Sequence, residues 1–237
     1  MKKGLFILFL VIAFALAVVA SPGLSKRGKK QKKPKPGKPS QPPSSSDADF
    51  AKDSLSGAAN GHVCDVSKIK TKANGTQLKN GGRSCSDTQI GEIPDVSQMV
   101  SSLITTPENG QVLKANTPFT VSVISANLAT GNFDDPETEY YKFSQQLNKK
   151  GFIKGHTHIT VQRLISTKSA PDARDPIFFK GLNNITKEST LSVEVTPGLI
   201  PGIYRICTMT ASFAHQPLIM PVAKRGAQDD CIRVKTA

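Results

Sequence analysis

Short runs of alternating apolar and polar residues constrain the fold of this chain more than any other feature. Such runs cover 118–126, 158–165, 190–195 and 202–211, and a last one, "DCIRVK", lies near the C-terminus. Because successive side chains of a β-strand point to opposite faces, a period of two residues predicts strands with one buried face. Proline, glycine and asparagine between the runs are typical of turns. We therefore expect a mainly β fold, an immunoglobulin-like antiparallel β-sandwich.

One stretch, "IPDVSQMVSSLI", departs from this alternation. Its apolar residues have the i, i+3, i+4 spacing of a helix, with Asp95 as N-cap and Gln98 as its capping-box partner. We expect one short helix here, or at least an ordered lead-in, built on Val96, Met99, Val100, Leu103 and Ile104. The segment 140–150, "YYKFSQQLNKK", is compatible with a second helical turn or with a long loop between strands.

The N-terminus predicts export. In residues 1–20, Lys2 and Lys3 precede a continuous apolar stretch that ends in the small residue Ala20 and is followed by "SPG". This is the layout of a secretory signal peptide. A membrane anchor is the alternative, because about 20 apolar residues span a bilayer. We expect cleavage and a secreted, extracellular protein with no transmembrane segment after signal removal.

Residues 21–60 are rich in lysine, proline, serine and glycine, a composition that predicts a disordered arm. The remainder, 61–237, has a suitable length for one domain. The chain's formal charge of +13 belongs mainly to the arm, because 39–237 contains 21 basic and 18 acidic residues. Eight basic residues and no acidic one lie in 26–38: Lys26, Arg27, Lys29, Lys30, Lys32, Lys33, Lys35 and Lys38.

Three roles are open for this basic arm. It could bind polyanions of a cell wall or membrane surface, act as a nuclear-import-like signal inside a host cell, or serve as a solvated spacer. Lys26-Arg27 is also a candidate dibasic processing site. Nucleic-acid binding by the folded domain itself is not expected at its small net charge.

The cysteines and sequons fit an exported chain. An even number of cysteines in such a chain favours disulfides. Four cysteines allow three pairings, and we expect Cys64–Cys85 and Cys207–Cys231, because each pair closes a short loop within one region. The sequons at Asn74 and Asn184 predict glycosylation of surface loops.

Two histidines are the strongest candidates for a functional site. His156 and His158 share one face of a predicted strand, where two imidazoles can bind one metal ion. Hydrogen bonding across strands is the simpler explanation of the same pair. A third ligand could come from His215, or from the acidic residues Asp134, Asp135, Glu137 and Glu139.

Motifs for catalysis are weak by comparison. The sequence contains no Gly-x-Ser-x-Gly elbow of a serine hydrolase. The run "FDDPETE" could supply carboxylates for glycoside cleavage, but a solvated loop explains it as well. The chain has no tryptophan, which disfavours a sugar-stacking surface. We expect no enzymatic activity and no cofactor.

Several segments together resemble an uncharacterised family of fungal secreted proteins. They are "GHTHITVQ", "FFKGLN", "GIYRICTMTA", "HQPLIMPVA" and "DDCIR", in this order within about 61–235. The resemblance implies a signal peptide followed by one sandwich-like domain, and it transfers no catalytic residue. The lysine-rich arm departs from the plain family pattern.

These observations lead to one expected function and two alternatives. The first is a secreted, non-enzymatic protein at the fungal surface or host interface, whose basic arm contacts polyanions or whose domain binds a host protein. The second is an effector delivered to a host nucleus. The third is a metal-binding protein that uses His156 and His158.

Overall fold

The computed structural model describes residues 63–184 and 190–237. The expected signal peptide, 1–20, and the expected basic arm, 21–60, lie outside the described residues. None of the helices in the described part is long and apolar enough to cross a membrane.

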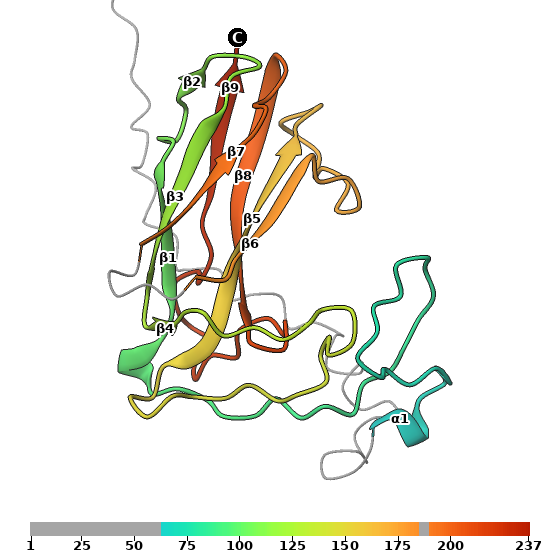
Figure 1. The fold of residues 1–237 in the computed structure, drawn as a ribbon. Helices are drawn as coiled ribbons and strands as arrows, with labels where there is room; N and C mark the ends of the chain where they lie inside the picture. The colour runs from blue at the N-terminus through green and yellow to red at the C-terminus, as the bar shows by residue number, and fades with distance from the viewer. Residues whose placement is uncertain (1–62, 185–189) are drawn as a thin grey trace, which may run out of the picture. The chain divides into compact units, whose positions relative to one another are not determined.

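Two β-sheets face each other, as the alternating runs predicted (Figure 1). The three-stranded sheet has the order β1-β3-β7 and is antiparallel throughout; its strands are β1 (Ser101–Thr106), β3 (Phe119–Ala126) and β7 (Thr190–Val195). The larger sheet has the order β2-β9-β8-β5-β4, and β6 also pairs with β5. Its strands are β2 (Val112–Leu113), β4 (Leu128–Ala129), β5 (Ile153–Arg163), β6 (Phe178–Leu182), β8 (Gly202–Ser212) and β9 (Cys231–Thr236). The short pairs β2–β9 and β4–β5 are parallel, which the alternation did not predict.

The main core lies between the two sheets, where the predicted apolar faces meet. Burying these side chains contributes about 1.5–3 kcal/mol for each large aliphatic residue. The three-stranded sheet contributes Ile104, Val121, Val123, Leu191 and Val195. The larger sheet contributes Ile159, Val161, Leu182, Tyr204, Ile206, Ile232 and Val234.

Tyr204 marks the immunoglobulin-like character of the sandwich. It lies near the start of β8, is 1% exposed, and donates a hydrogen bond of 2.8 Å from its hydroxyl to the main-chain oxygen of Ile200. A tyrosine that bonds back to the chain a few residues upstream is the tyrosine corner of such sandwiches. It fixes the chain at the point where the turn around Pro201 enters the strand.

The helix expected in this stretch forms as one short turn, and the rest of the stretch is an ordered lead-in that becomes a strand. Only Val96–Gln98 is helical, as one 3₁₀ turn, and β1 begins at Ser101. Asp95 is the N-cap, as predicted, and its side chain accepts a hydrogen bond from the Ser97 main chain.

Sheet pairing decides the structure of this stretch. In β1, Ser102 and Ile104 are buried while Leu103 is 59% exposed, so strand alternation overrides the helical spacing. The Gln98 side chain bonds to the main-chain oxygen of Lys150 instead of completing a capping box. A short helix that the sequence analysis did not identify, α1, spans Val63–Val66.

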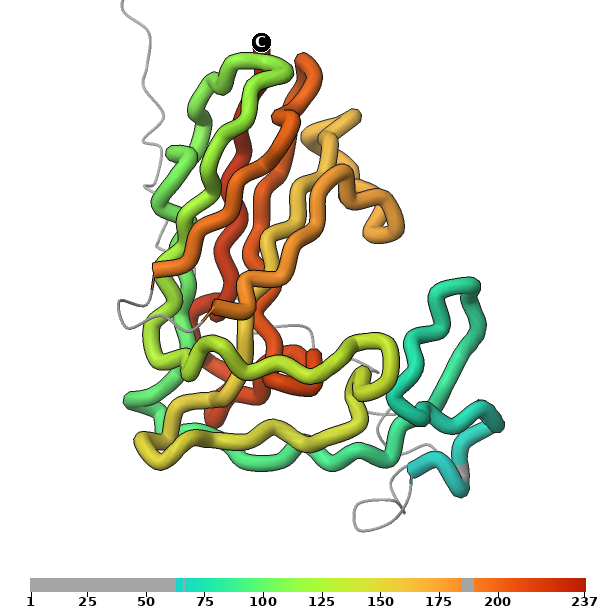
Figure 2. Tube along the Cα trace, viewed as in Figure 1, coloured from blue at the N-terminus to red at the C-terminus, as the bar shows by residue number. Residues whose placement is uncertain are grey.

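Two long irregular segments run beside each other at one end of the sandwich (Figure 2). They are residues 67–95 and the connection 130–152 between β4 and β5, so the segment 140–150 is an inter-strand loop. The buried Gln145 joins them: its side chain donates to the main-chain oxygens of Glu92 and Ile219 and accepts from the Ile219 nitrogen.

Candidate functional site

The polar face of β5 holds the two predicted histidines. His156 lies opposite Ala211 of β8, and His158 lies opposite Met209. Unlike the outer face of an ordinary surface strand, this face is covered: His156 is 1% exposed and His158 is 8% exposed. The sequence predicted that these two side chains share a face, but it gave no sign of their burial.

Gly155 allows β5 and β8 to approach at this point. A Cβ atom at this position would lie 2.1 Å from the main-chain oxygen of Ala211, well inside contact distance. Glycine is therefore the residue that fits directly before His156.

His215 completes a cluster with the other two histidines. It follows β8 in a turn closed by a hydrogen bond of 2.9 Å from its own main-chain nitrogen to the Ser212 oxygen, and its φ is 69°. Its ring centroid lies 4.5 Å from that of His156 and 5.8 Å from that of His158. One nitrogen from each of the three rings lies within 4.8 Å of the others.

Main-chain oxygens fix the orientation of two of the rings. Nδ1 of His156 lies 3.1 Å from the oxygen of Asn132, and Nδ1 of His158 lies 2.9 Å from the oxygen of Met209. Because a carbonyl oxygen only accepts, each Nδ1 carries the proton in the neutral ring, and each Nε2 has a free lone pair. Nε2 of His156 and Nδ1 of His215 are buried and have no hydrogen-bond partner among the described residues.

Burial favours the neutral form of all three histidines. Desolvation, followed by the proximity of His158 and His215, lowers the pKa of His156 to about 3. Desolvation also lowers the pKa of His158, against opposing effects of the Met209 carbonyl and Asp229. The pKa of His215 is lowered by desolvation and by His158, although Asp135 opposes this shift. The cluster therefore presents unprotonated nitrogens at neutral pH.

The cluster lies against a pocket of about 580 Å³, which we call the histidine pocket. His158 and His215 form part of its wall, and the Phe179 ring stacks on His158 with 5.0 Å between centroids. Tyr140 and Tyr141, whose rings stack on each other at 4.0 Å, add a second aromatic surface. The pocket thus combines aromatic walls with imidazole nitrogens, as ligand sites commonly do.

The acidic residues considered as further ligands do not join the cluster, which consists of the three histidines alone. Glu137 forms an ion pair with Lys79 at the pocket, and Glu139 pairs with Lys142. Asp135 accepts a hydrogen bond from the Glu137 main chain. His215 is therefore the third residue of the site.

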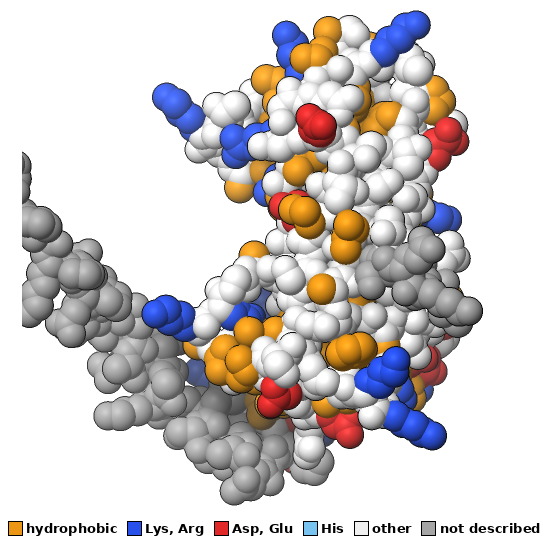
Figure 3. Space-filling view, turned by 90° about the vertical axis from the view of Figure 1, so that its left-hand side faces the viewer, with side chains coloured by type: hydrophobic (Ala, Val, Ile, Leu, Met, Phe, Trp, Pro, Cys, Tyr) orange, Lys and Arg blue, Asp and Glu red, His pale blue; other side chains and the backbone are white. Residues whose placement is uncertain are grey.

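The remaining predicted residues lie elsewhere. Both expected disulfides are present, Cys64–Cys85 and Cys207–Cys231. Asn74 and Asn184 are exposed, so they are accessible to glycosylation, which stays a prediction. The basic residues of 26–38 lie outside the described residues. On the face shown in Figure 3, the lysine and arginine side chains are scattered and do not form one patch.

Several site residues were missed by sequence reasoning. Phe179, Asn132 and Met209 touch the histidines from β6, from an irregular loop and from β8. Their roles depend on strand register and loop position, which no motif encodes. The phrase "GHTHITVQ" contained the only usable signal.

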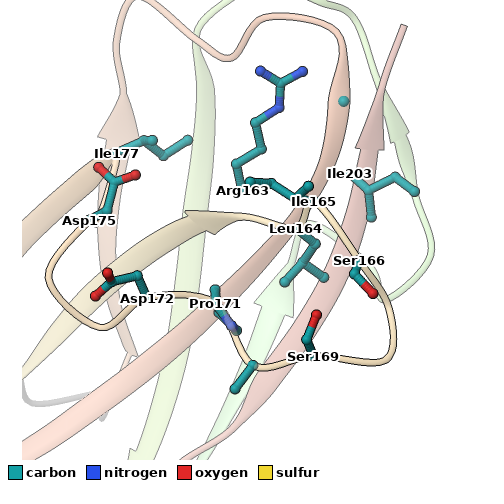
Figure 4. A pocket seen from close by; sticks show the side chains of 12 residues that line it. Arg163, Leu164, Ile165, Ser166, Ser169, Pro171, Asp172, Asp175, Ile177 and Ile203 are labelled. Atoms are coloured by element: carbon teal, nitrogen blue, oxygen red, sulfur yellow. The ribbon is translucent and has the colours of Figure 1, made fainter.

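A second pocket, of about 890 Å³, lies at the other end of β5 beneath the loop 164–177. Figure 4 shows the carboxylates of Asp172 and Asp175 on one side and the hydroxyls of Ser166 and Ser169 on the other. The Asp172 carboxylate forms an ion pair with the Arg174 guanidinium. None of the residues that line this pocket has a buried side-chain atom without a hydrogen-bond partner. The histidine pocket is therefore the better candidate.

Comparison with known proteins identifies the family of the chain. A family model described as the CLU5d N-terminal domain matches residues 102–237, which include all three clustered histidines and the second disulfide. The chain is 40% identical over 183 residues to "Pathogenicity cluster 5 protein d" of Colletotrichum graminicola. The match covers 74% of this chain and 38% of that protein, so the chain corresponds to well under half of its relative's length.

Proposed function

Because the chain belongs to the family of the CLU5d N-terminal domain, we propose that it is a secreted, non-enzymatic protein that acts at the fungal surface or host interface. The observation that carries this proposal is the 40% identity to a fungal protein named for a pathogenicity cluster. Two disulfides, which form and persist in oxidising compartments, support the extracellular part of the proposal.

The sandwich serves as a rigid support for recognition. The histidine pocket, with its aromatic walls and the Lys79–Glu137 ion pair, is where the folded domain contacts its partner. The basic residues of 26–38 add attraction to polyanions, which salt would weaken.

A binding role suits the pocket better than catalysis. Its carboxylates are engaged in structural contacts: Glu137 pairs with Lys79, and Asp229 accepts from the Thr208 hydroxyl and the Thr210 nitrogen. Histidine is the commonest general acid or base and works best with a pKa near the working pH, whereas burial moves the pKa of His158 and of His215 below the ordinary histidine value.

The proposal is tested by following the tagged full-length chain during expression in a filamentous fungus. We expect the protein in the culture filtrate and at sites of contact with a host. A variant without residues 2–20 should remain inside the cell. Retention of the full-length protein in the cell would contradict secretion.

The lysine-rich segment favours a second candidate, a host-delivered effector that enters the nucleus. Its composition in 26–38 resembles an import signal. Comparing the full-length chain with a variant lacking 26–38 separates the two candidates. Nuclear signal that disappears with the deletion supports the effector, whereas unchanged extracellular retention with no nuclear signal in either form excludes it.

A further inference from the structure

We propose that His156, His158 and His215 form a binding site for one divalent transition-metal ion, zinc or copper. The three rings come from two positions on β5 and from the turn after β8, so folding alone brings them together. One nitrogen of each lies within 4.8 Å of the others. This site goes beyond the proposed function and does not depend on it.

The two main-chain contacts prepare the rings for such an ion. Metal-binding histidines commonly donate their second N–H to a carbonyl, which fixes both tautomer and orientation. Here the oxygens of Asn132 and Met209 receive the Nδ1 protons of His156 and His158. Both Nε2 atoms are thereby left as ligands.

A bound ion would provide a partner for two nitrogens of the cluster. Nε2 of His156 and Nδ1 of His215 are buried without a partner among the described residues, and the His156 side chain is almost wholly inaccessible. Nearly all buried polar atoms in proteins have a partner. Hydrogen bonds to main-chain oxygens account for the Nδ1 atoms of His156 and His158. A metal ion would be the partner of the nitrogens that have none.

The ligand set selects the class of metal. Imidazole suits zinc, copper, iron and nickel, whereas calcium and magnesium require oxygen ligands. Metal–nitrogen bonds of about 2.0–2.1 Å place tetrahedral ligand nitrogens about 3.3 Å apart, so the rings must close slightly around the ion. His215 can supply this movement because it lies on a turn and is only partly buried.

The histidine pocket gives the ion its access. His158 and His215 both line this pocket, while His156 lies behind them. Three protein ligands leave at least one coordination position, which then faces the aromatic walls formed by Phe179 and Tyr140. A small oxygen or nitrogen donor could bind there.

The test uses the chain purified with both disulfides formed, from a secretion host or by oxidative refolding, stripped with a chelator and dialysed against Zn²⁺ or Cu²⁺. We expect one equivalent of metal per chain. Cu²⁺ should give an electron paramagnetic resonance spectrum with nitrogen hyperfine splitting. Each of His158→Gln and His215→Asn should weaken binding by at least roughly 100-fold, since loss of a mere second-shell partner costs about 10–100-fold.

His215→Asn is chosen because asparagine tolerates a positive φ. The matched control is His62→Ala, which removes the chain's fourth histidine and should leave binding unchanged. Circular dichroism confirms that each variant is folded. Absence of bound metal in the folded wild-type chain would overturn the proposal. An equal loss of metal affinity in His62→Ala and His215→Asn would also overturn it. Neither outcome affects the secretion experiment.

Discussion

Nδ1 of His158 lies 2.9 Å from the main-chain oxygen of Met209, its directly opposed residue on β8. The strand pairing that builds the larger sheet therefore also orients the ring. A change that shifts β5 against β8 alters the site even where it touches no histidine.

Gly155→Ala tests this link between sheet pairing and site. The new Cβ would lie 2.1 Å from the Ala211 main-chain oxygen, which cannot rotate away as a side chain could. We expect a loss of about 1–3 kcal/mol in the free energy of unfolding, as for other overpacked positions, measured by urea denaturation.

The matched control for this change is Gly226→Ala, because a Cβ at that position would meet no atom within 4 Å apart from the adjoining residues of the chain. It should leave the stability within about 0.5 kcal/mol of wild type. Equal stability of the two variants would show that β5 and β8 separate without cost.

The stability of the metal-free protein should fall as the pH drops below about 6.5. His156 has a pKa of about 3 in the folded chain, while an unfolded histidine titrates near 6.5. Between these values the unfolded state binds the extra proton, so the stabilisation is complete above pH 6.5 and is lost as pH falls. The slope reaches about 1.4 kcal/mol per pH unit for this histidine.

Asp229 near His158 and Asp135 near His215 oppose the shifts of those two rings, so His156 should dominate the slope. Urea denaturation between pH 4.5 and 7.5 in the presence of a chelator measures how the free energy of unfolding changes with pH. His156→Gln should flatten the curve, whereas His62→Ala should not. A slope unchanged in His156→Gln would contradict the assignment.

Tyr204 and Thr236 share one acceptor. Both hydroxyls donate to the main-chain oxygen of Ile200. Tyr204→Phe alone should cost about 0.5–1.5 kcal/mol, because the oxygen keeps the Thr236 bond, and the same holds for Thr236→Val. The double variant should cost more than the sum, since the oxygen then lacks both partners. Costs that add within about 0.3–0.5 kcal/mol in urea denaturation would show no coupling.

Gln145 should be essential for the two irregular segments. Gln145→Leu removes three hydrogen bonds to main-chain atoms of Glu92 and Ile219. We expect a loss of about 2 kcal/mol or more, since each buried group without a partner costs about 1–3 kcal/mol. Hydrogen exchange of residues 87–95 should also accelerate.

The neighbouring exposed Gln146 offers the control, because its side chain bonds only to the Lys154 ammonium among the contacts of the described residues. Gln146→Leu should change stability by less than about 0.5 kcal/mol. A similar effect of both substitutions would mean that the segments are held by other contacts.

The sheets were predictable where one face of a strand is apolar and the other polar. Ile159 and Val161 fell on the core side, as their alternation indicated. The structure of 96–104 was not predictable, because Val100 and Ile104 fit both the helical and the strand period, and pairing with β3 decided between them. The local spacing of apolar residues carries no information about the free energy gained by pairing with a neighbouring strand.

The site was predictable only in part for a similar reason. His156 and His158 are fixed by a two-residue period, but His215 is 57 positions beyond His158. Its approach depends on a turn in which a histidine has a positive φ. The burial of the polar face of β5 depends on β6 and the irregular segments, neither of which the alternation described.

The positions of the three tyrosines have a spectroscopic consequence. The chain has no tryptophan and three tyrosines, so its intrinsic fluorescence arises from tyrosine alone. Tyr204 is buried between the sheets, while Tyr140 and Tyr141 line the histidine pocket, with the Tyr140 ring 6.0 Å from that of His215. Emission from one unlabelled sample therefore carries two signals: quenching in the native state reports occupation of the pocket, and the change on unfolding reports the core.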